Sequence, residues 1–348
     1  MRDRSIISPA HAGHPALEGS DDNRQGSRTG SGELTKPAVD VLIAAWNRSE
    51  TIQRAVMSAL AQPDVRAVIV VDDGSSDDTA SRARDCAVDS CRLVVERLVE
   101  NRGPSAARNL ALQISTAPWV TPLDADDYLL AGRIAALLAK AEAWDFVADD
   151  LLRARDGADG SMRPALFERH FDPRPLSFEQ FVRGNVTSRG LLRKELGFLK
   201  PLIRRSFLER HGLRYDERLR LGEDYALYAR ALLAGARFLL VPVEGYVSVI
   251  RDDSISSRHS REDLERLRDS DRDLIAQTSL TAGERRALKS RYQSVDCRVQ
   301  WLVAIEAVNS REFARFMSTF GRSPKVSLFL VERLLEEVFT RARRAMGW

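Results

Sequence analysis

The sequence predicts an α/β fold with a mostly parallel central sheet, followed by a helical C-terminal extension. Short apolar runs alternate with amphipathic stretches over residues 39–123, which is the pattern of right-handed β-α-β crossovers. The run Val65–Val71 is almost continuously apolar, as expected for a parallel strand that is covered on both faces. From Ser260 onward, charged and apolar residues alternate at helical spacing almost to Trp348.

The individual elements follow from local signals, such as the proline in the first turn of the helix expected at Pro104–Ser115. The predicted strands are Val39–Ala45, Val65–Val71, Arg92–Glu96, Trp119–Leu123, Trp144–Ala148 and Phe238–Val243. The predicted helices are 47–61, Asp77–Val88, Pro104–Ser115, Ile134–Ala143, Ser206–His211 and Tyr225–Ala234. The first of these helices is expected to start near Asn47 and Ser49.

Composition divides the chain into three parts. Residues 1–36 are rich in Ser, Gly, Asp and Arg with mixed charge, and we expect them to form a disordered tail. Residues 37–259 contain the α/β pattern and are expected to form the main domain. Residues 260–348 are expected to form the helical extension.

Composition also limits the partners and the compartment. The 53 basic and 50 acidic residues leave a net charge of +3, which gives no reason to expect nucleic-acid binding. Cys86, Cys91 and Cys297 form no metal-ligand spacing, and their odd number favours a reducing compartment. No apolar run approaches the roughly 18 residues of a membrane span, and no apolar segment of a secretory signal follows Arg2 and Arg4. These features predict a cytoplasmic protein.

Three carboxylates follow a short apolar run within residues 118–128. In an extended backbone, side chains at positions i and i+2 project to the same side, so Asp124 and Asp126 would face one point and Asp127 would turn away. Two hard oxygen ligands at a strand end suit Mg²⁺ or Mn²⁺ and leave coordination positions for substrate phosphates. The alternative is a polar turn that caps a helix beginning at Leu129.

A second acidic cluster follows the predicted strand Val65–Val71. Ligands of open α/β sheets bind at the carboxyl ends of the strands, where Asp72 and Asp73 would accept hydrogen bonds from a ribose hydroxyl or a base N–H. The alternative is a helix N-cap at Ser76 or Asp77, which leaves the preceding pair of acids unexplained.

Two further segments place charged side chains near helix starts. In Glu100–Asn109, Gly and Pro set a turn into a helix, from which Arg108 would reach either the ligand or a strand-end carboxylate. Glu223 and Asp224 begin another predicted helix, where acids commonly complement the helix dipole. A carboxylate fixed at a helix end also suits a general base that must lie close to an acceptor hydroxyl.

The order of five motifs resembles that of the family 2 glycosyltransferases. The motifs are Val41–Asn47, Val71–Ser75, Asn101–Asn109, Leu123–Asp127 and Gly222–Asp224. The resemblance covers about residues 38–250, and it implies a GT-A type nucleotide-sugar-binding fold that transfers sugars with inversion from nucleotide-sugar donors. Residues 211–216 and 222–231 are also similar to the succinoglycan-type exopolysaccharide glucosyltransferases of rhizobia.

This resemblance implies a role for individual acidic residues. Asp224 would be the catalytic base, supported by Glu223. Asp126 would ligate Mg²⁺ or Mn²⁺, and Asp124 would lie beside the ribose or the metal. The remaining nucleotide-binding residues would be Ala44, Trp46, Asn47, Arg108 and either Asp72 or Asp73, of which Asp73 is favoured for the uridine.

Two parts of the sequence qualify this assignment. The Pro and Tyr that are usual in the first motif of the family are replaced here by Ala44 and Trp46, and Trp46 would either stack on a base or fill the core. Arg258 and His259 lie in a segment that resembles the loop closing over the diphosphate, and the alternative is a solvated polar linker. The aromatic, basic stretch 161–200 is the candidate acceptor side.

The resemblance further implies the partners. The expected donor is a UDP-sugar, with UDP-glucose as the best choice, and the expected product is a β-linkage on a lipid-linked saccharide. The basic, amphipathic segment 325–348 would either contact a membrane surface peripherally or pack on the protein. A sugar-phosphate nucleotidyltransferase is disfavoured because Ala44–Ser49 is not a Gly- and Arg-rich phosphate loop, and a non-catalytic binding scaffold is the remaining alternative.

Overall fold

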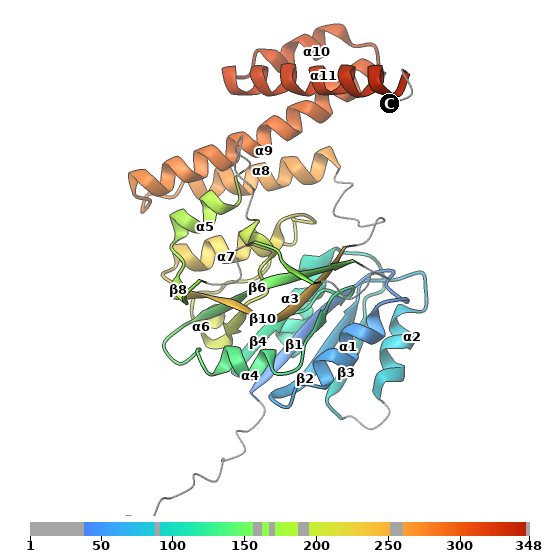
Figure 1. Cartoon of the computed structure of the whole chain (residues 1–348), viewed down its shortest axis with the longest axis vertical. Helices are drawn as coiled ribbons and strands as arrows, with labels where there is room; N and C mark the ends of the chain where they lie inside the picture. The colour runs from blue at the N-terminus through green and yellow to red at the C-terminus, as the bar shows by residue number, and fades with distance from the viewer. Residues whose placement is uncertain are drawn as a thin grey trace, which may run out of the picture. The chain divides into compact units, whose positions relative to one another are not determined.

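A computed structural model describes residues 38–87, 91–155, 162–166, 171–186, 195–250 and 260–345, so the predicted disordered tail lies outside the described residues (Figure 1). The strands are β1 (Val39–Ala45), β2 (Val65–Asp72), β3 (Leu93–Arg97), β4 (Trp119–Pro122), β5 (Tyr128–Leu129), β6 (Phe146–Arg155), β7 (Arg163–Pro164), β8 (Arg174–Pro175), β9 (Leu202–Arg204) and β10 (Phe238–Ile250). The helices are α1 (Ile52–Leu60), α2 (Thr79–Arg84), α3 (Pro104–Ile114), α4 (Arg133–Leu138), α5 (Phe178–Gly184), α6 (Arg205–Arg210), α7 (Glu223–Leu233), α8 (Arg261–Ile275), α9 (Ala282–Asn309), α10 (Phe313–Phe320) and α11 (Pro324–Ala345).

The sheet has the order β3-β2-β1-β4-β9-β6-β10-β5, with β7 beside β6 and β8 beside β10. Strands β1, β2, β3 and β4 pair in parallel, and so do β6 and β10. The short strand β9 pairs antiparallel with both β4 and β6, so the two parallel groups run in the same direction. The prediction of a mostly parallel α/β sheet is therefore confirmed.

Helices cover both faces of the sheet, because alternate residues of the buried strands point to opposite sides. Leu42 and Ile69 belong to one core, which also contains residues of α3, α5, α7, α8 and α9. Ile43 and Val70 belong to the other core, with residues of α1, α2 and α4. The carboxyl ends of β1, β2 and β4 emerge between these two layers, and loops there carry most of the predicted site residues.

Several boundaries differ from the prediction for local reasons. The first helix begins at Ile52 and not near Asn47, because Asn47 has a positive φ of 51° and lies in a loop. Tyr128–Leu129 is strand β5, antiparallel to Tyr246–Val247 of β10, so the alternative of a helix starting at Leu129 is wrong. Strand β10 continues to Ile250 and pairs with β6 on both sides of a register shift between Val241 and Tyr246.

The predicted helical extension comprises α8 to α11. Side-chain capping boxes start α8 at Ser260 and α9 at Thr281. Helix α9 packs against α5 and α8, whereas α10 and α11 pack against α9 in a small separate cluster around Val326 and Leu330. Among the described helices, none combines the length and the apolar content that a membrane crossing requires.

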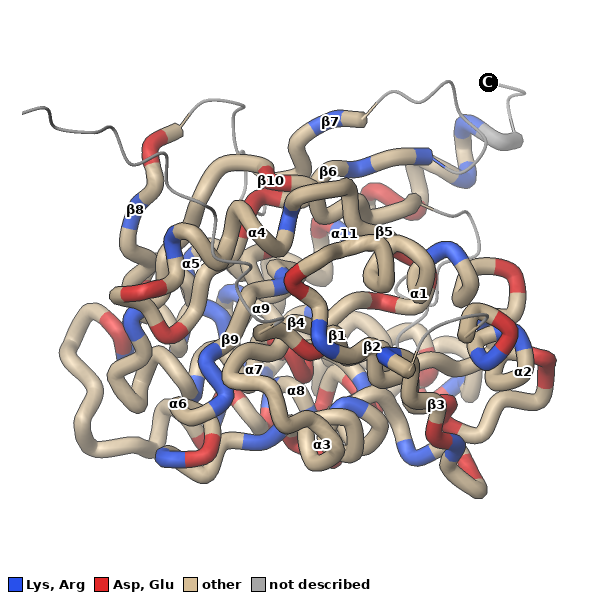
Figure 2. Tube along the Cα trace, turned by 90° about the horizontal axis from the view of Figure 1, so that it is seen from below, with Lys and Arg blue, Asp and Glu red and all other residues tan. Residues whose placement is uncertain are grey.

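Charged residues of both signs are interspersed along the chain, as the view in Figure 2 shows.

Candidate functional site

A pocket of about 410 Å³ lies at the carboxyl ends of β1, β2 and β4. Its lining includes eight of the predicted site residues, which are Ala44, Trp46, Asp73, Arg108, Asp124, Asp126, Glu223 and Asp224. Asn47 and Asp72 do not line it, and Arg258 and His259 lie outside the described residues. Residues from five separate segments of the sequence therefore meet at one concave site, as predicted for the end of a parallel sheet.

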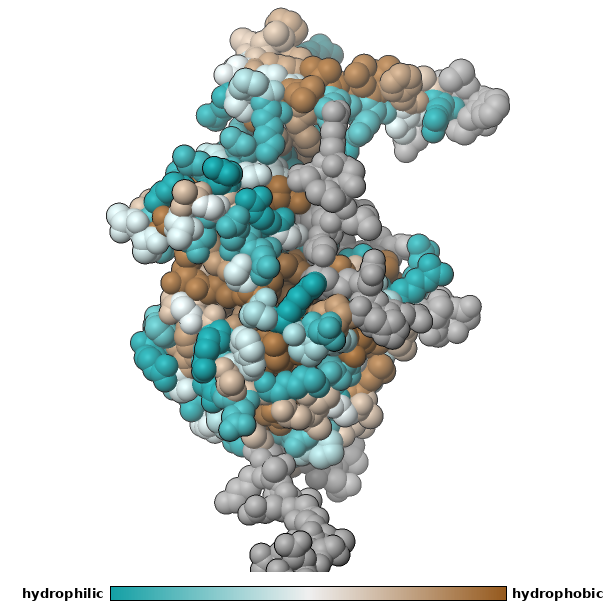
Figure 3. All heavy atoms as spheres, turned by 60° about the vertical axis from the view of Figure 1, so that its left-hand side comes forward, coloured by the Kyte–Doolittle hydropathy of each residue, from teal (hydrophilic) through white to brown (hydrophobic). Residues whose placement is uncertain are grey.

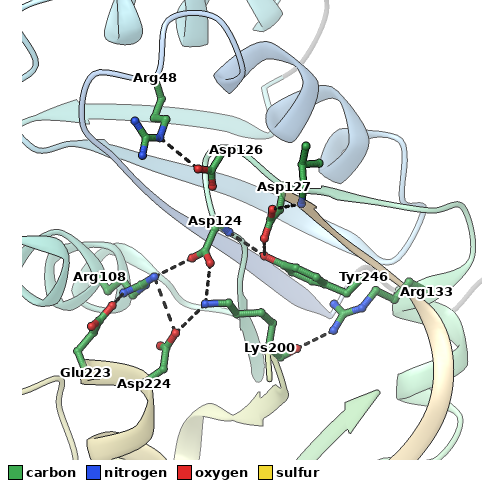
Figure 4. Close-up of polar contacts among 11 residues, drawn as sticks. Arg48, Arg108, Asp124, Asp126, Asp127, Arg133, Lys200, Glu223, Asp224 and Tyr246 are labelled. Carbon is green, nitrogen blue, oxygen red and sulfur yellow. Dashed lines mark hydrogen bonds and ion pairs between the residues drawn. The ribbon is translucent and has the colours of Figure 1, made fainter. Parts of the chain in front are cut away.

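The acids of the fourth motif, Leu123–Asp127, lie in a turn and not in an extended strand. Strand β4 ends at Pro122, and the N–H of Asp127 donates to the carbonyl of Asp124 at 3.1 Å. The extended-backbone reason for expecting Asp124 and Asp126 to face one point is therefore wrong. Figure 4 shows that the three carboxylates contact three different sets of partners.

Asp124 is held by two buried cations. One of its oxygens contacts Nη2 of Arg108 at 2.8 Å, and the other contacts Nζ of Lys200 at 2.8 Å. Burial alone would raise the pKa of Asp124, but the charges of Lys200 and Arg108 outweigh it and lower that pKa to about 2. Asp124 is therefore ionised throughout the neutral range, with both oxygens engaged by the protein.

Asp126 is held by fewer ion pairs than Asp124, the other predicted metal ligand. Its carboxylate pairs with the Nε of Arg48, at 3.4 Å, while its carbonyl accepts from Nη2 of Arg54 at 2.7 Å. Burial and the neighbouring charge of Asp124 raise the pKa of Asp126. A bound cation would relieve both of these unfavourable effects on the carboxylate.

Asp127 has a structural position behind the pocket. Its carboxyl group accepts from the hydroxyl of Tyr246 at 2.8 Å and from the N–H of Val249 at 2.9 Å. The same hydroxyl accepts the N–H of Asp124 at 3.1 Å, so Tyr246 connects the acidic turn to β10. Burial and the charges of Asp124 and Asp126 raise the pKa of Asp127 to about 8.

Glu223 and Asp224 form the first turn of α7, after Gly222 at the N-cap with a φ of 72°. Glu223 contacts Nη1 of Arg108 at 2.5 Å, and Asp224 contacts Nζ of Lys200 at 2.7 Å. Burial opposes the charge of Arg108, but Asp224, Glu223 and Asp124 together raise the pKa of this guanidinium. Arg108 is thus a structural partner of three carboxylates, which corresponds to the second of its two predicted roles.

In the second acidic cluster, Asp72 is buried away from the pocket and Asp73 lines it. Asp72 is fully buried, accepts from the N–H of Ser75 at 3.2 Å and pairs with Nε of Arg97 at 3.2 Å, which explains its position away from the pocket. Asp73 lies on the pocket wall and accepts the N–H groups of Arg102 and Gly103 at 2.8 Å each. Burial raises the pKa of Asp73 despite these hydrogen bonds.

The first motif contributes one exposed aromatic ring. Trp46 is 42% exposed and lines the pocket, so it does not fill the core. Asn47 instead fixes the loop, since its N–H donates to Oγ of Ser75 at 2.9 Å and its Oδ1 accepts the N–H of Ser76 at 2.9 Å. Of the aromatic residues predicted on the acceptor side, Phe198 lines the pocket, whereas Phe181 is buried.

Three residues of the site were not assigned a role from the sequence. These are Arg48, Lys200 and Tyr246, which contact Asp126, Asp124 and Asp127 respectively. No local pattern marks Lys200 or Tyr246, because both are far from the acids in sequence. Within the described part of the chain, no group of three Asp, Glu, His or Cys side chains is arranged to hold a metal ion by itself.

Comparison with known proteins identifies the family. The family model described as Glycosyl transferase family 2 matches residues 40–204. The chain is also 44% identical to the succinoglycan biosynthesis protein ExoU of Rhizobium meliloti (strain 1021) over 80% of this chain and 81% of that protein. The chain belongs to glycosyl transferase family 2. The succinoglycan biosynthesis protein ExoO of the same organism is 32% identical over 88% of this chain and 87% of its own length.

Solved structures support the GT-A fold of this family 2 member. TarS of S. aureus in complex with UDP-GlcNAc has a TM-score of 0.58, at 16% identity, over 80% of this chain and 89% of that one. The mannosyltransferase PcManGT from Pyrobaculum calidifontis, in complex with GDP-Man and Mn²⁺, has a TM-score of 0.54, at 15% identity, over 88% of both chains. The resemblance inferred from the five motifs is therefore confirmed for both family and fold.

Proposed function

We propose that this family 2 glycosyltransferase moves a sugar from a UDP-sugar to a saccharide acceptor with inversion, and that Asp224 is the base. The observation that carries the proposal is the environment of Asp224. Its side chain lines the pocket, one oxygen is held by Lys200, and Oδ1 is buried without a hydrogen-bond partner among the described residues. An unpaired buried carboxylate oxygen is costly, and an incoming hydroxyl would satisfy it.

The proposed reaction is a direct displacement at the anomeric carbon. Asp224 takes the proton of the acceptor hydroxyl, whose oxygen attacks the anomeric carbon from the face opposite the UDP. The new C–O bond forms as the bond to the diphosphate breaks, so an α-linked donor gives a β-linked product. A base in this position contributes roughly 10²- to 10⁴-fold to the rate. Asp73 and Trp46, which also line the pocket, are proposed to bind the uridine.

We further propose that Asp126 holds a divalent cation, with Asp124 beside it. The fit rests on the raised pKa of Asp126 and on its position in the pocket lining, where a single carboxylate and the donor diphosphate suit Mg²⁺ or Mn²⁺. When bound, such a cation stabilises the negative charge of the departing diphosphate. Arg48 is close enough to Asp126 to neutralise it when no cation is present.

The substrate class is proposed from the relatives. Two shorter matches, 33% identical over 126 residues and 34% identical over 97 residues, are named as β-1,3-glucosyltransferases that act on diphospho-undecaprenol-linked saccharides. Together with the ExoU and ExoO similarity, these names support UDP-glucose as donor and a lipid-linked oligosaccharide of exopolysaccharide assembly as acceptor.

The first test is UDP release from a panel of nucleotide sugars, with Mg²⁺, Mn²⁺ or EDTA, in the presence of membranes from the source organism lacking the gene. We expect turnover of one donor, at least about 10²-fold slower in Asp224→Asn, while UDP affinity changes little. Asp126→Asn should lose metal-dependent turnover and metal-dependent UDP binding. Unchanged turnover in Asp224→Asn would reject its role as base, and donor binding without any turnover would favour the binding scaffold.

We also propose peripheral membrane contact through α11. Leu328, Leu335 and Phe339 are exposed on this helix, and hydrophobic residues form a row near the top of Figure 3. Basic side chains such as Arg333 and Arg341 lie on the same helix, which suits an anionic lipid surface. Cosedimentation with phosphatidylglycerol vesicles should decrease in Leu335→Glu. A second copy of the chain on this face would instead give a dimer that Leu335→Glu dissociates, as size-exclusion chromatography would reveal.

A further inference from the structure

Lys200 connects the proposed base, Asp224, with Asp124, the carboxylate proposed to lie beside the cation. Its ammonium lies 2.7 Å from Asp224 and 2.8 Å from Asp124. The residue is only 3% exposed, although it lines the pocket. Figure 4 shows the ammonium between the acidic turn after β4 and the first turn of α7.

The main chain of Lys200 is held in place by a buried arginine. Nη2 of Arg133 donates to the carbonyl of Lys200 at 2.6 Å and to Asp149 at 2.7 Å. Arg133 and Asp149 are both fully buried, and Asp149 also accepts the N–H groups of Gly245 and Tyr246. A flexible side chain is therefore attached to a rigid, fully buried anchor, which limits the positions that its ammonium reaches.

Carboxylates outnumber cations around the ammonium of Lys200. Arg108 and Lys200 face the three carboxylates of Asp124, Glu223 and Asp224. Burial opposes the charge of Lys200, but Asp124 and Asp224 outweigh it and raise its pKa. Lys200 is thus positioned as a hydrogen-bond donor and counter-charge between Asp124 and Asp224.

The two oxygens of Asp224 are not equivalent. Oδ2 accepts from Lys200, while Oδ1 is buried without a hydrogen-bond partner in the described part of the chain. The neighbouring Tyr215 is also buried, and burial, the charge of Asp224 and a side-chain hydrogen bond with Asp224 raise its pKa. The bond from Lys200 to Oδ2 fixes the carboxylate plane and thereby determines where Oδ1 points.

We propose that Lys200 is a positioning residue for sugar transfer: it orients Asp224 so that Oδ1 meets the acceptor hydroxyl, and it ties that orientation to the donor-side carboxylate of Asp124. The inference rests on the proposed function, because it assigns Lys200 a role through the base. Lys200 itself makes no bond to the reacting atoms in this scheme.

The test compares Lys200→Met with Lys140→Met. Lys140 is the control, because it pairs with a carboxylate, Glu244 at 2.9 Å, but does not line the pocket. With UDP-glucose and membranes from the source organism lacking the gene, Lys200→Met should lower kcat about 10²-fold, the cost of a misplaced catalytic group. The KM for UDP-glucose and the Kd for UDP should each stay within about threefold, since the base does not contribute to donor binding. Lys140→Met should match the wild type.

A double variant keeps the test decisive if Lys200→Met folds poorly. Lys200→Met combined with Asp224→Asn removes one charge of each sign, so it leaves no new excess charge in the site. If Lys200 acts through Asp224, the double variant transfers radiolabelled glucose as slowly as Asp224→Asn alone. A further loss of about 10²-fold in the double variant, or a folded Lys200→Met with wild-type kcat, would overturn the inference. Absence of transfer by the wild type would instead contradict the proposed function.

Discussion

Gly74 directly follows Asp73 and lies against the backbone of residues 100 and 101, so its replacement tests how this part of the site is packed. Its φ is 69°, and a Cβ at this position would lie 2.7 Å from the carbonyl carbon of Glu100 and 2.9 Å from the amide nitrogen of Asn101. Both contacts are with backbone, which cannot rotate away as a side chain would. Gly74→Ala should therefore displace the segment that donates N–H groups to Asp73.

A second glycine serves as a control that separates the backbone cost of Gly74→Ala from its overpacking cost. Gly212 has a φ of 60° and nothing within 4 Å of an added Cβ, so Gly212→Ala isolates the backbone cost. That cost is about 1–2 kcal/mol for a left-handed L-residue. Gly74→Ala has the same cost and in addition an overpacking cost of about 1–3 kcal/mol. We thus expect a total loss of about 2–5 kcal/mol in the free energy of unfolding.

Urea denaturation of both variants measures these losses, and titration calorimetry measures UDP affinity. We expect Gly74→Ala to be less stable than Gly212→Ala by at least about 1 kcal/mol and to bind UDP more weakly, because the loop at Asp73 has moved. Gly212→Ala should bind UDP as the wild type does. Equal stability of the two variants, with unchanged UDP affinity in both, would refute the reasoning about the close approach at Glu100.

Two further predictions concern the acids behind the pocket. In the metal-free native state, Asp127 keeps its proton up to about pH 8, whereas in the unfolded chain it loses the proton near pH 4. Because the native state binds this proton more tightly, the free energy of unfolding should fall as the pH rises from about 4 to about 8. Asp127→Asn mimics the neutral carboxyl and should flatten this fall, as urea denaturation in EDTA at pH 5 and pH 8 would show; parallel curves would contradict it. Tyr246→Phe removes the hydroxyl that accepts from Asp124 and donates to Asp127, and it should cost about 1–3 kcal/mol of unfolding free energy. A loss below about 0.5 kcal/mol would show that water replaces this hydroxyl.

The sequence predicts the sheet well where one local pattern decides the structure. Strand β1 has the predicted bounds, because the apolar run Val39–Ala45 is buried on both faces and has polar residues after it. The acidic turn was less predictable. Its residues follow a strand, but the hydrogen bond from Asp127 to Asp124 ends the extended conformation before the carboxylates begin.

Long-range partners of the site were the least predictable part. Asp124 is paired with Lys200, which is 76 residues away in the chain, and Asp127 with Tyr246, at a separation of 119 residues. Neither partner belongs to a motif, and an isolated lysine after a loop or a tyrosine in a strand is common in any α/β protein. Only the strand pairing, which places β9 beside β4 and β10 beside β5, determines that these side chains meet the acids.

The contact between α9 and α7 has a consequence for local unfolding. Arg291 of α9 pairs with Asp271 of α8 at 2.5 Å, and its guanidinium lies 3.5 Å from the ring centroid of Tyr225. Tyr225 directly follows Asp224 and stacks on Phe181 at 5.3 Å. Amide hydrogens of α7 should therefore exchange with solvent together with those of α8 and α9, as one cooperative unit. The order of the helix that carries the proposed base thus depends on α8 and α9, and all three helices lie beyond residue 204, where the family 2 match ends.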